Sequence, residues 1–196
     1  MRKAIFFDMG GVLFKEGFAE SIRAYEEMHN IPEGKFYTSA HDRPYWREFT
    51  LGNITEPDYI KQVSADFGQE VLLDDWHELL RQNFPPHADV LEFIKTLKGK
   101  YILGVISNNP KEWFDYFWAT YKLNELFTVR SIASYIHVRK PDQCIFQYAL
   151  DQARVRGDEA TYIDNRPERV DGAVALGIEV VVFESLKHLQ DILSKK

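Results

Sequence analysis

The fold is decided by residues 4–13, Ala4-Ile5-Phe6-Phe7-Asp8-Met9-Gly10-Gly11-Val12-Leu13. The first four of these residues are apolar, and Asp8 followed by a pair of glycines ends the run. A short strand without polar alternation is typical of burial on both faces, as in a parallel sheet covered by helices. The stretch therefore predicts a central parallel strand with a carboxylate at its carboxyl end.

The same pattern returns further along the chain. Residues 101–106 and 160–163 are mostly apolar segments that lead into polar segments ending in Pro110 and Pro167. The segment 178–183, mostly apolar as well, predicts another buried strand. We expect helices between these runs at 87–98, 111–121, 141–155 and 167–176. Strands that alternate with helices predict an α/β fold, with a Rossmann-like doubly wound parallel sheet as its core.

Three of the four predicted helices of this core begin beside a proline, at Pro110, Pro141 or Pro167, and proline suits the first helical turn. Asn109 and Asn165 each stand three residues before a glutamate, which is the spacing of a helix cap and its acidic partner. The polar residues that precede the prolines should collect at the carboxyl edge of the sheet. Open α/β sheets bind their ligands at that edge.

Residues 15–85 have a different pattern. Helices are expected near 18–29, 43–50, 56–67 and 73–83, with no convincing strand among them, and Pro85-Pro86 closes the stretch. We therefore expect a core made of residues 1–14 and 86–196 and a helical cap, residues 15–85, inserted after the first strand.

Composition narrows the class of protein. The 196 residues include 30 acidic and 24 basic ones, and a net charge of −6 argues against nucleic acid as a partner. The single cysteine, Cys144, excludes an intrachain disulfide. No apolar stretch approaches the roughly 18 residues of a membrane span. We expect a cytoplasmic protein that does not bind membranes; the sequence leaves its oligomeric state open.

Four polar residues at the predicted strand ends and helix starts suit phosphoryl transfer, in which catalysis is mostly positioning and charge neutralisation. They are a carboxylate, a hydroxyl, a cation and a second carboxylate: Asp8, Ser107, Lys140 and Asp164. A carboxylate that attacks phosphorus gives an acyl phosphate and splits one difficult step into two.

Four segments carry a family resemblance: Phe7–Leu13, Ile106–Asn109, Arg139–Asp142 with Ile145-Phe146, and Tyr162–Pro167. In this order they resemble the four motifs of the haloacid dehalogenase superfamily of hydrolases, close to its small sugar-phosphatase-like members. The resemblance implies that Asp8 is the nucleophile and that Ser107 and Lys140 hold the phosphoryl group. It also implies a Mg²⁺ site made by Asp8, the carbonyl of Gly10, Asp164 and Asn165.

Two positions depart from the pattern of that family. Its phosphatases carry an acidic residue two positions after the nucleophile, where it protonates the leaving group, and this chain has Gly10 there. Many relatives have a second aspartate where this chain has Asn165, and an amide ligand brings no charge to a magnesium site. If a proton is delivered to the leaving group in this chain, a residue of the predicted cap such as His41 or Asp42 is its alternative source, in place of an acid at position 10.

The stretch His41–Arg47 is dense in polar and aromatic groups. We expect it to form the wall that selects the substrate, with Arg43 and Arg47 as binding residues beside Asn108, although an amphipathic helix start explains the pattern nearly as well. The aromatic run Trp113–Trp118 falls largely on one helical face and is interpreted as core packing.

These observations favour a magnesium-dependent phosphatase that hydrolyses a small phosphorylated metabolite, such as a sugar phosphate, through an aspartyl-phosphate. Two alternatives remain open. In the first, Asp8 attacks carbon and the protein is a 2-haloacid dehalogenase. In the second, the altered positions 10 and 165 have left a catalytically weakened binding or regulatory protein with the same fold.

Overall fold

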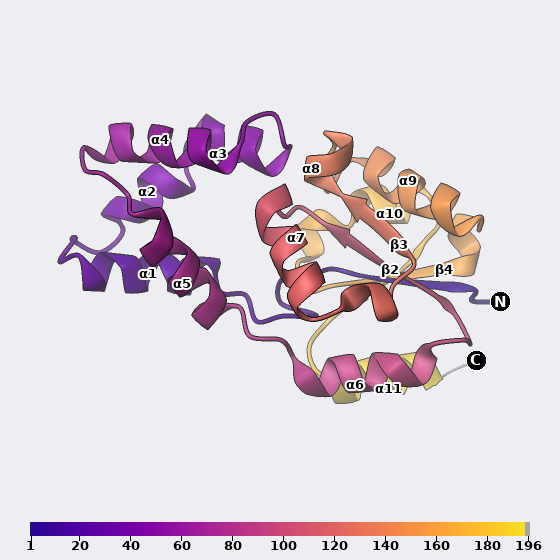
Figure 1. Cartoon of the computed structure of the whole chain (residues 1–196). Helices are drawn as coiled ribbons and strands as arrows, with labels where there is room; N and C mark the ends of the chain where they lie inside the picture. The colour runs from indigo at the N-terminus through magenta and orange to yellow at the C-terminus, as the bar shows by residue number, and fades with distance from the viewer. Residues whose placement is uncertain (195–196) are drawn as a thin grey trace.

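A five-stranded parallel sheet forms the centre of the larger part of the molecule (Figure 1). The computed structural model describes residues 1–194 of the chain. The strand order is β3-β2-β1-β4-β5, and every neighbouring pair is parallel. The strands are β1 (Ala4–Phe7), β2 (Ile102–Ser107), β3 (Val129–Ile132), β4 (Ala160–Asp164) and β5 (Glu179–Val182). This order confirms the predicted doubly wound fold.

The central strand β1 is buried on both faces, as its apolar run predicts. Ile5 and Phe7 pack with residues from α6 (Ala88–Leu97), α7 (Lys111–Thr120) and α11 (Leu186–Ser194). Ala4 and Phe6 belong to a second cluster, with α9 (Gln143–Ala153) and α10 (Asp171–Ala175). Alternate residues of one strand therefore supply the two hydrophobic layers of the core.

The segment between β1 and α6 is helical, and we call residues 15–85 the helical insertion. Its helices are α1 (Phe18–Met28), α2 (Lys35–Ala40), α3 (Pro44–Thr50), α4 (Glu56–Phe67) and α5 (Leu73–Asn83). They lie together at one end of the molecule, beyond the carboxyl edge of the sheet (Figure 1). None of the helices within residues 1–194 is long and apolar enough to cross a membrane.

The two connections to the helical insertion run side by side. The amide of Lys15 donates to the carbonyl of Pro85 at 3.0 Å, and that of His87 donates to Leu13 at 2.8 Å. A side chain at Gly17 would stand 1.9 Å from the carbonyl oxygen of Asn83, so only glycine allows this close approach. The chain therefore enters and leaves the insertion through two adjacent, hydrogen-bonded segments, residues 13–17 and 83–87, which we call the paired crossing.

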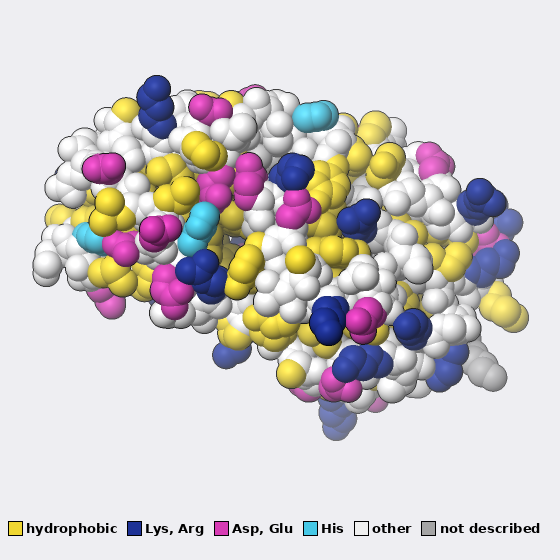
Figure 2. Space-filling model, viewed as in Figure 1, with side chains coloured by type: hydrophobic (Ala, Val, Ile, Leu, Met, Phe, Trp, Pro, Cys, Tyr) yellow, Lys and Arg dark blue, Asp and Glu magenta, His cyan; other side chains and the backbone are white. Residues whose placement is uncertain are grey.

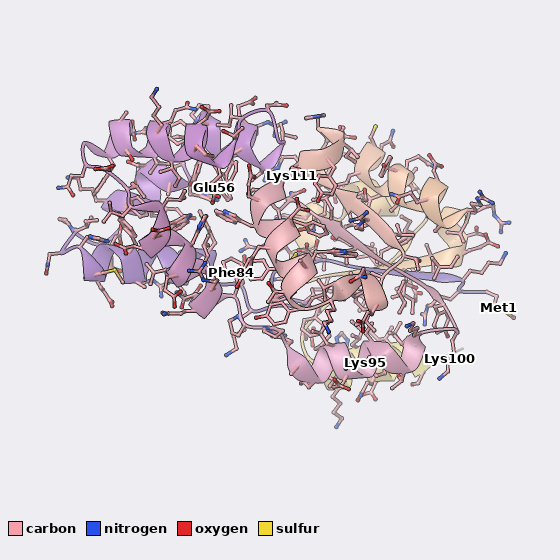
Figure 3. All side chains as sticks on the ribbon, viewed as in Figure 1. Met1, Glu56, Phe84, Lys95, Lys100 and Lys111 are labelled. Carbon is pink, nitrogen blue, oxygen red and sulfur yellow. The ribbon has the colours of Figure 1, made fainter. Side chains whose placement is uncertain are left out.

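A second contact joins the helical insertion to the sheet-containing part. The buried carboxylate of Glu56, at the start of α4, accepts a hydrogen bond from the indole of Trp113 in α7 at 2.6 Å. Thr50, at the end of α3, accepts a hydrogen bond from Arg139 at 3.0 Å. Figure 3 places Glu56 on the side of the insertion that faces Lys111, the first residue of α7. Helices α3 and α4 of the insertion are thus both bonded to the sheet-containing part.

Several local expectations from the sequence are wrong. Strand β3 and the helices α2, α8 (Ala133–Ile136) and α11 are present but were not expected. The single helix expected at 167–176 is divided into a 3₁₀ turn, Pro167–Arg169, and α10. Neither Asn109 nor Asn165 caps a helix, because the residues at the cap positions are Pro110 and Arg166 and no side-chain cap bond forms there.

Candidate active site

The carboxyl ends of the three central strands bring the predicted catalytic residues together. Asp8 directly follows β1, Ser107 ends β2 and Asp164 ends β4. The register aligns Phe7 with Val105 on one side and with Ile163 on the other, so the three strands end at the same level. All three polar side chains are buried. Parallel pairing alone therefore gathers them at one edge of the sheet.

Lys140 connects the two carboxylates. Its ammonium nitrogen lies 2.8 Å from Asp8 Oδ1 and 2.8 Å from Asp164 Oδ2, and it donates to the hydroxyl of Tyr162 at 2.7 Å. The side chain of Lys140 is buried, so solvent does not screen this network. Tyr162 was missed in the sequence, although it stands two residues before Asp164 on β4 and must share its face.

Burial and charge act in opposite directions on the two carboxyls. Burial raises the pKa of Asp8 more than the ammonium of Lys140 lowers it, and the neighbouring Asp164 raises it further. Burial also acts on Asp164, but Lys140 and hydrogen bonds from Tyr162 and the Arg166 amide lower its pKa below the ordinary value. Asp164 is therefore the more firmly ionised partner of Lys140.

Asn108 positions the lysine rather than capping a helix. Its amide oxygen accepts from the backbone amide of Lys140 at 2.8 Å, and its amide nitrogen donates to the carbonyl of the same residue at 3.2 Å. The neighbouring hydroxyl of Ser107 accepts from the amide of Asn109 at 3.2 Å. The loop after β2 thus fixes the segment that carries Lys140.

The donor set fits a magnesium ion. Within residues 1–194, no cluster of three histidine, cysteine or acidic side chains could hold a metal by itself, so carbonyl and amide oxygens would have to contribute. Asn165 supplies such an oxygen, because its buried Oδ1 has no hydrogen-bond partner while its Nδ2 donates to Glu16 at 3.1 Å. Two carboxylates with neutral oxygens beside them suit Mg²⁺, which prefers oxygen ligands.

A cavity of about 430 Å³ opens above these residues. Its core side includes Asp8, Gly10 and Ser107, and its other side belongs to the helical insertion. The remaining lining is basic or aromatic to a large extent, with contributions from Arg139, Arg166, Arg169, Phe18, Tyr37, His41, Trp46 and Trp113. The site is therefore built jointly by the two parts of the chain.

The aromatic wall of the cavity is closely packed. The rings of Phe18 and Trp46 stack with centroids 4.6 Å apart, and Trp113 approaches Trp46 to 5.8 Å. His41 lies against the same wall, with its Nδ1 2.9 Å from Asp42 Oδ1. The interpretation of Trp113 as core packing alone is incomplete, because this residue also lines the cavity.

The two arginines expected to bind substrate lie elsewhere. Arg43 donates to Asp66 at 2.9 Å on the surface of the helical insertion, and it does not line the cavity. Arg47 lines a separate hollow of about 210 Å³ beside His137 and Pro141. The arginines that do line the cavity come from the sheet-containing part. One of them, Arg139, lies within the motif Arg139–Asp142 of the sequence analysis.

Comparisons with known proteins agree with this geometry. Residues 6–183 match the family model of the haloacid dehalogenase-like hydrolases. A flavin mononucleotide hydrolase of Arabidopsis thaliana is 22% identical over 191 residues, covering 97% of this chain and 76% of that protein. A sesquiterpene phosphatase of Aspergillus oryzae is 24% identical over 181 residues, covering 90% and 87%.

A solved structure has the same fold. A haloacid dehalogenase family enzyme from Bacteroides thetaiotaomicron superimposes with a TM-score of 0.82 at 21% identity, covering 96% of this chain and 98% of that one. The same enzyme was solved in complex with magnesium and inorganic phosphate (TM-score 0.77, 19% identity, 96% and 99% covered). With a family match over most of its length and this architecture, the chain belongs to the haloacid dehalogenase-like hydrolases.

Proposed function

We propose that this hydrolase is a magnesium-dependent phosphatase that acts on a small phosphorylated metabolite through an aspartyl-phosphate on Asp8. The observation that carries the proposal is the buried ammonium of Lys140, which lies 2.8 Å from Asp164 and 2.8 Å from Asp8, a residue that lines the cavity. A fixed cation beside a carboxylate nucleophile suits a transferring phosphoryl group, whose oxygens accumulate negative charge. The two phosphatase relatives and the phosphate complex of the Bacteroides enzyme support the same reading.

The reaction begins at the carboxylate of Asp8. Its Oδ1 is held by Lys140 and by the amide of Met9 at 2.7 Å, which leaves the other oxygen to attack phosphorus. A bond forms from this oxygen to phosphorus as the ester bond to the leaving oxygen breaks. Water then attacks the phosphorus of the aspartyl-phosphate, releases inorganic phosphate and restores the carboxylate. Ser107 and Lys140 hold the phosphoryl oxygens in both steps.

Magnesium would be held by Asp8, the carbonyl of Gly10, Asp164 and Asn165. When bound, it would neutralise charge on the phosphoryl oxygens. Asp164 is ionised and already held in place by Lys140, Tyr162 and the amide of Arg166. The protein itself therefore fixes the orientation of this carboxylate.

The proton for the leaving group needs a source, because Gly10 stands where relatives carry an acid. His41 is the candidate that the cavity offers, since its imidazole lines the wall and is oriented by Asp42. A protonated imidazole is a general acid that can donate its proton to a departing alkoxide. In this assignment the core supplies the nucleophile, and the helical insertion supplies the acid and the selective wall.

The test is a panel of phosphorylated metabolites assayed for phosphate release with magnesium and with a chelator, using Asp8→Asn as the blank. Hydrolysis that requires both magnesium and Asp8 is expected. Release of halide from 2-haloacids that survives the chelator would instead assign the protein as a dehalogenase. Failure of Asp8 to form a beryllium fluoride adduct, together with absence of turnover, would favour a non-catalytic binding protein.

A further inference from the structure

Two guanidinium groups that line the cavity have no carboxylate partner within residues 1–194. Lys140 is shared by Asp8 and Asp164, and Arg166 pairs with Glu16 and Glu168. Arg139 and Arg169 also line the cavity, yet neither forms an ion pair within residues 1–194, the part of the chain that the structure describes. Among the described residues, neither guanidinium is therefore held by an ion pair.

The surroundings of Arg139 are unfavourable for a cation. Burial, together with the charges of Arg169 and Arg47, lowers the pKa of Arg139 to about 10. The only hydrogen bond that the side chain donates within residues 1–194 goes to the hydroxyl of Thr50 at 3.0 Å. A desolvated guanidinium beside like charges gains much from a bound anion, because the anion replaces both the lost water and the missing counterion.

The phosphoryl group accounts for only part of the cavity's positive charge. Lys140 and Ser107 already serve the phosphoryl position next to Asp8, and the cavity of about 430 Å³ has room for a larger molecule. Arg169 lies near enough for its charge to lower the pKa of Asp8. Among the acidic lining residues, only Glu20 has no basic partner within residues 1–194. In the lining of the cavity, two arginines, Arg139 and Arg169, and one acid, Glu20, therefore have no ion-pair partner among the described residues.

We propose that Arg139 and Arg169 form a second anion subsite, so that the ligand is a phosphate ester whose leaving group carries another anionic group. This inference rests on the proposed function for the position of the phosphoryl group. Both a carboxylate and a second phosphate have the chemistry that a pair of guanidiniums recognises, since both accept paired hydrogen bonds from arginine. Phosphate esters of similar size whose leaving group is an uncharged sugar should bind less tightly.

Binding of non-hydrolysable phosphonates tests the subsite without turnover. Three ligands share one chain length: propylphosphonate, 3-phosphonopropionate and propane-1,3-bisphosphonate. Calorimetric titration with saturating magnesium should give about tenfold or greater tightening for one or both of the doubly anionic ligands over propylphosphonate, as expected for charge-assisted hydrogen bonds. The two doubly anionic ligands show whether carboxylate or phosphonate is preferred.

Arg139→Gln should remove most of this preference and leave the affinity for propylphosphonate within about threefold, since the loss concerns only the second anion. Arg139→Lys keeps the charge and should retain part of the preference, and it also serves if the glutamine variant does not fold. Arg156→Gln is the matched control, because it removes an exposed arginine paired with Asp158 outside the cavity. It should leave the preference intact.

Equal affinity for all three ligands in the unmodified protein would overturn the inference. So would an Arg139→Gln variant that weakens propylphosphonate as much as the doubly anionic ligands, since the arginine would then serve the phosphoryl group itself. Failure of the proposed function gives a different result, namely no hydrolysis of any phosphate ester while the binding preference persists. The two failures are therefore distinguishable.

Discussion

The sheet-containing part and the helical insertion differ in charge as well as in architecture. Residues 15–85 carry 14 acidic and 7 basic side chains, whereas the rest of the chain carries 16 acidic and 17 basic ones. On the face shown in Figure 2, acidic side chains gather over the insertion, and Lys and Arg are more frequent over the other part. The net negative charge of the protein therefore resides in the insertion, while the arginines that line the cavity belong to the rest of the chain.

Buried carboxylates serve different purposes in the two regions. In the core, Asp8 and Asp164 meet Lys140 at the cavity. In the insertion, the buried carboxylate of Glu26 accepts the backbone amides of Gly34 and Phe36 at 2.9 and 2.7 Å, which secures the turn before α2. The buried carboxylates of the core thus lie beside a buried cation, whereas Glu26 stabilises the backbone of the insertion itself.

The largest expected effect lies in the core. Asp8→Asn should lower turnover of every substrate by at least about a hundredfold, because the amide cannot attack phosphorus. The fold should persist, since Lys140 retains Asp164 as its partner. Steady-state rates and thermal unfolding measure the two effects. Substantial residual turnover in a folded variant would show that the reacting group does not reside in the core.

The second largest effect tests whether the insertion supplies the proton for the leaving group. His41→Gln should slow a primary alkyl phosphate by about tenfold or more and an aryl phosphate much less, since only the alkoxide needs a proton. Adding Gly10→Asp should restore the alkyl rate, because a side chain at position 10 meets nothing within 4 Å. If His41→Gln slows both substrates equally, the insertion does not supply the acid.

A smaller effect concerns the metal. Asn165→Asp should tighten magnesium binding by about fivefold, since a carboxylate adds charge to the site. The gain is limited because Asn165 donates to Glu16, which an aspartate would repel. The double variant Asn165→Asp with Glu16→Gln should therefore show a larger gain in magnesium affinity. Calorimetry that finds unchanged affinity in both variants would remove residue 165 from the metal site.

The smallest effect is expected on the outer surface of the insertion. Arg43→Gln removes only an exposed pair with Asp66, so kcat and KM should each change less than about twofold. A large rise in KM would place Arg43 in contact with substrate and would extend the selective wall beyond the cavity described above.

The core was predictable because its signals are local. The strands β1, β2 and β4 are apolar runs that end in polar residues, and each of these ends lies at the site. Strand β3 was missed because it has only four residues, of which Arg130 is exposed, and it depends on pairing with β2. Its existence is a property of the sheet rather than of its own sequence.

The wall contributed by the insertion was predictable only in outline. The dense stretch 41–47 does reach the cavity through His41 and Trp46, but the side chains of Arg43 and Arg47 do not. Tyr37 and Phe18 join the wall because helices α1 and α2 pack beside α3, and no spacing in the sequence specifies that packing. The periodicity of apolar residues in a helix predicts which side chains face inward, but it does not predict which of them meet across the cavity.

The junction of the two regions has an optical consequence. Trp113 belongs to core helix α7, and the indoles of Trp46 and Trp76 in the insertion lie 5.8 and 6.0 Å from it. Indole transitions at such separations couple, and the coupling depends on their distance and mutual angle. Any rotation of the insertion about its paired crossing would therefore change the near-ultraviolet circular dichroism and the tryptophan fluorescence. Such a rotation can be followed in the protein without an added label.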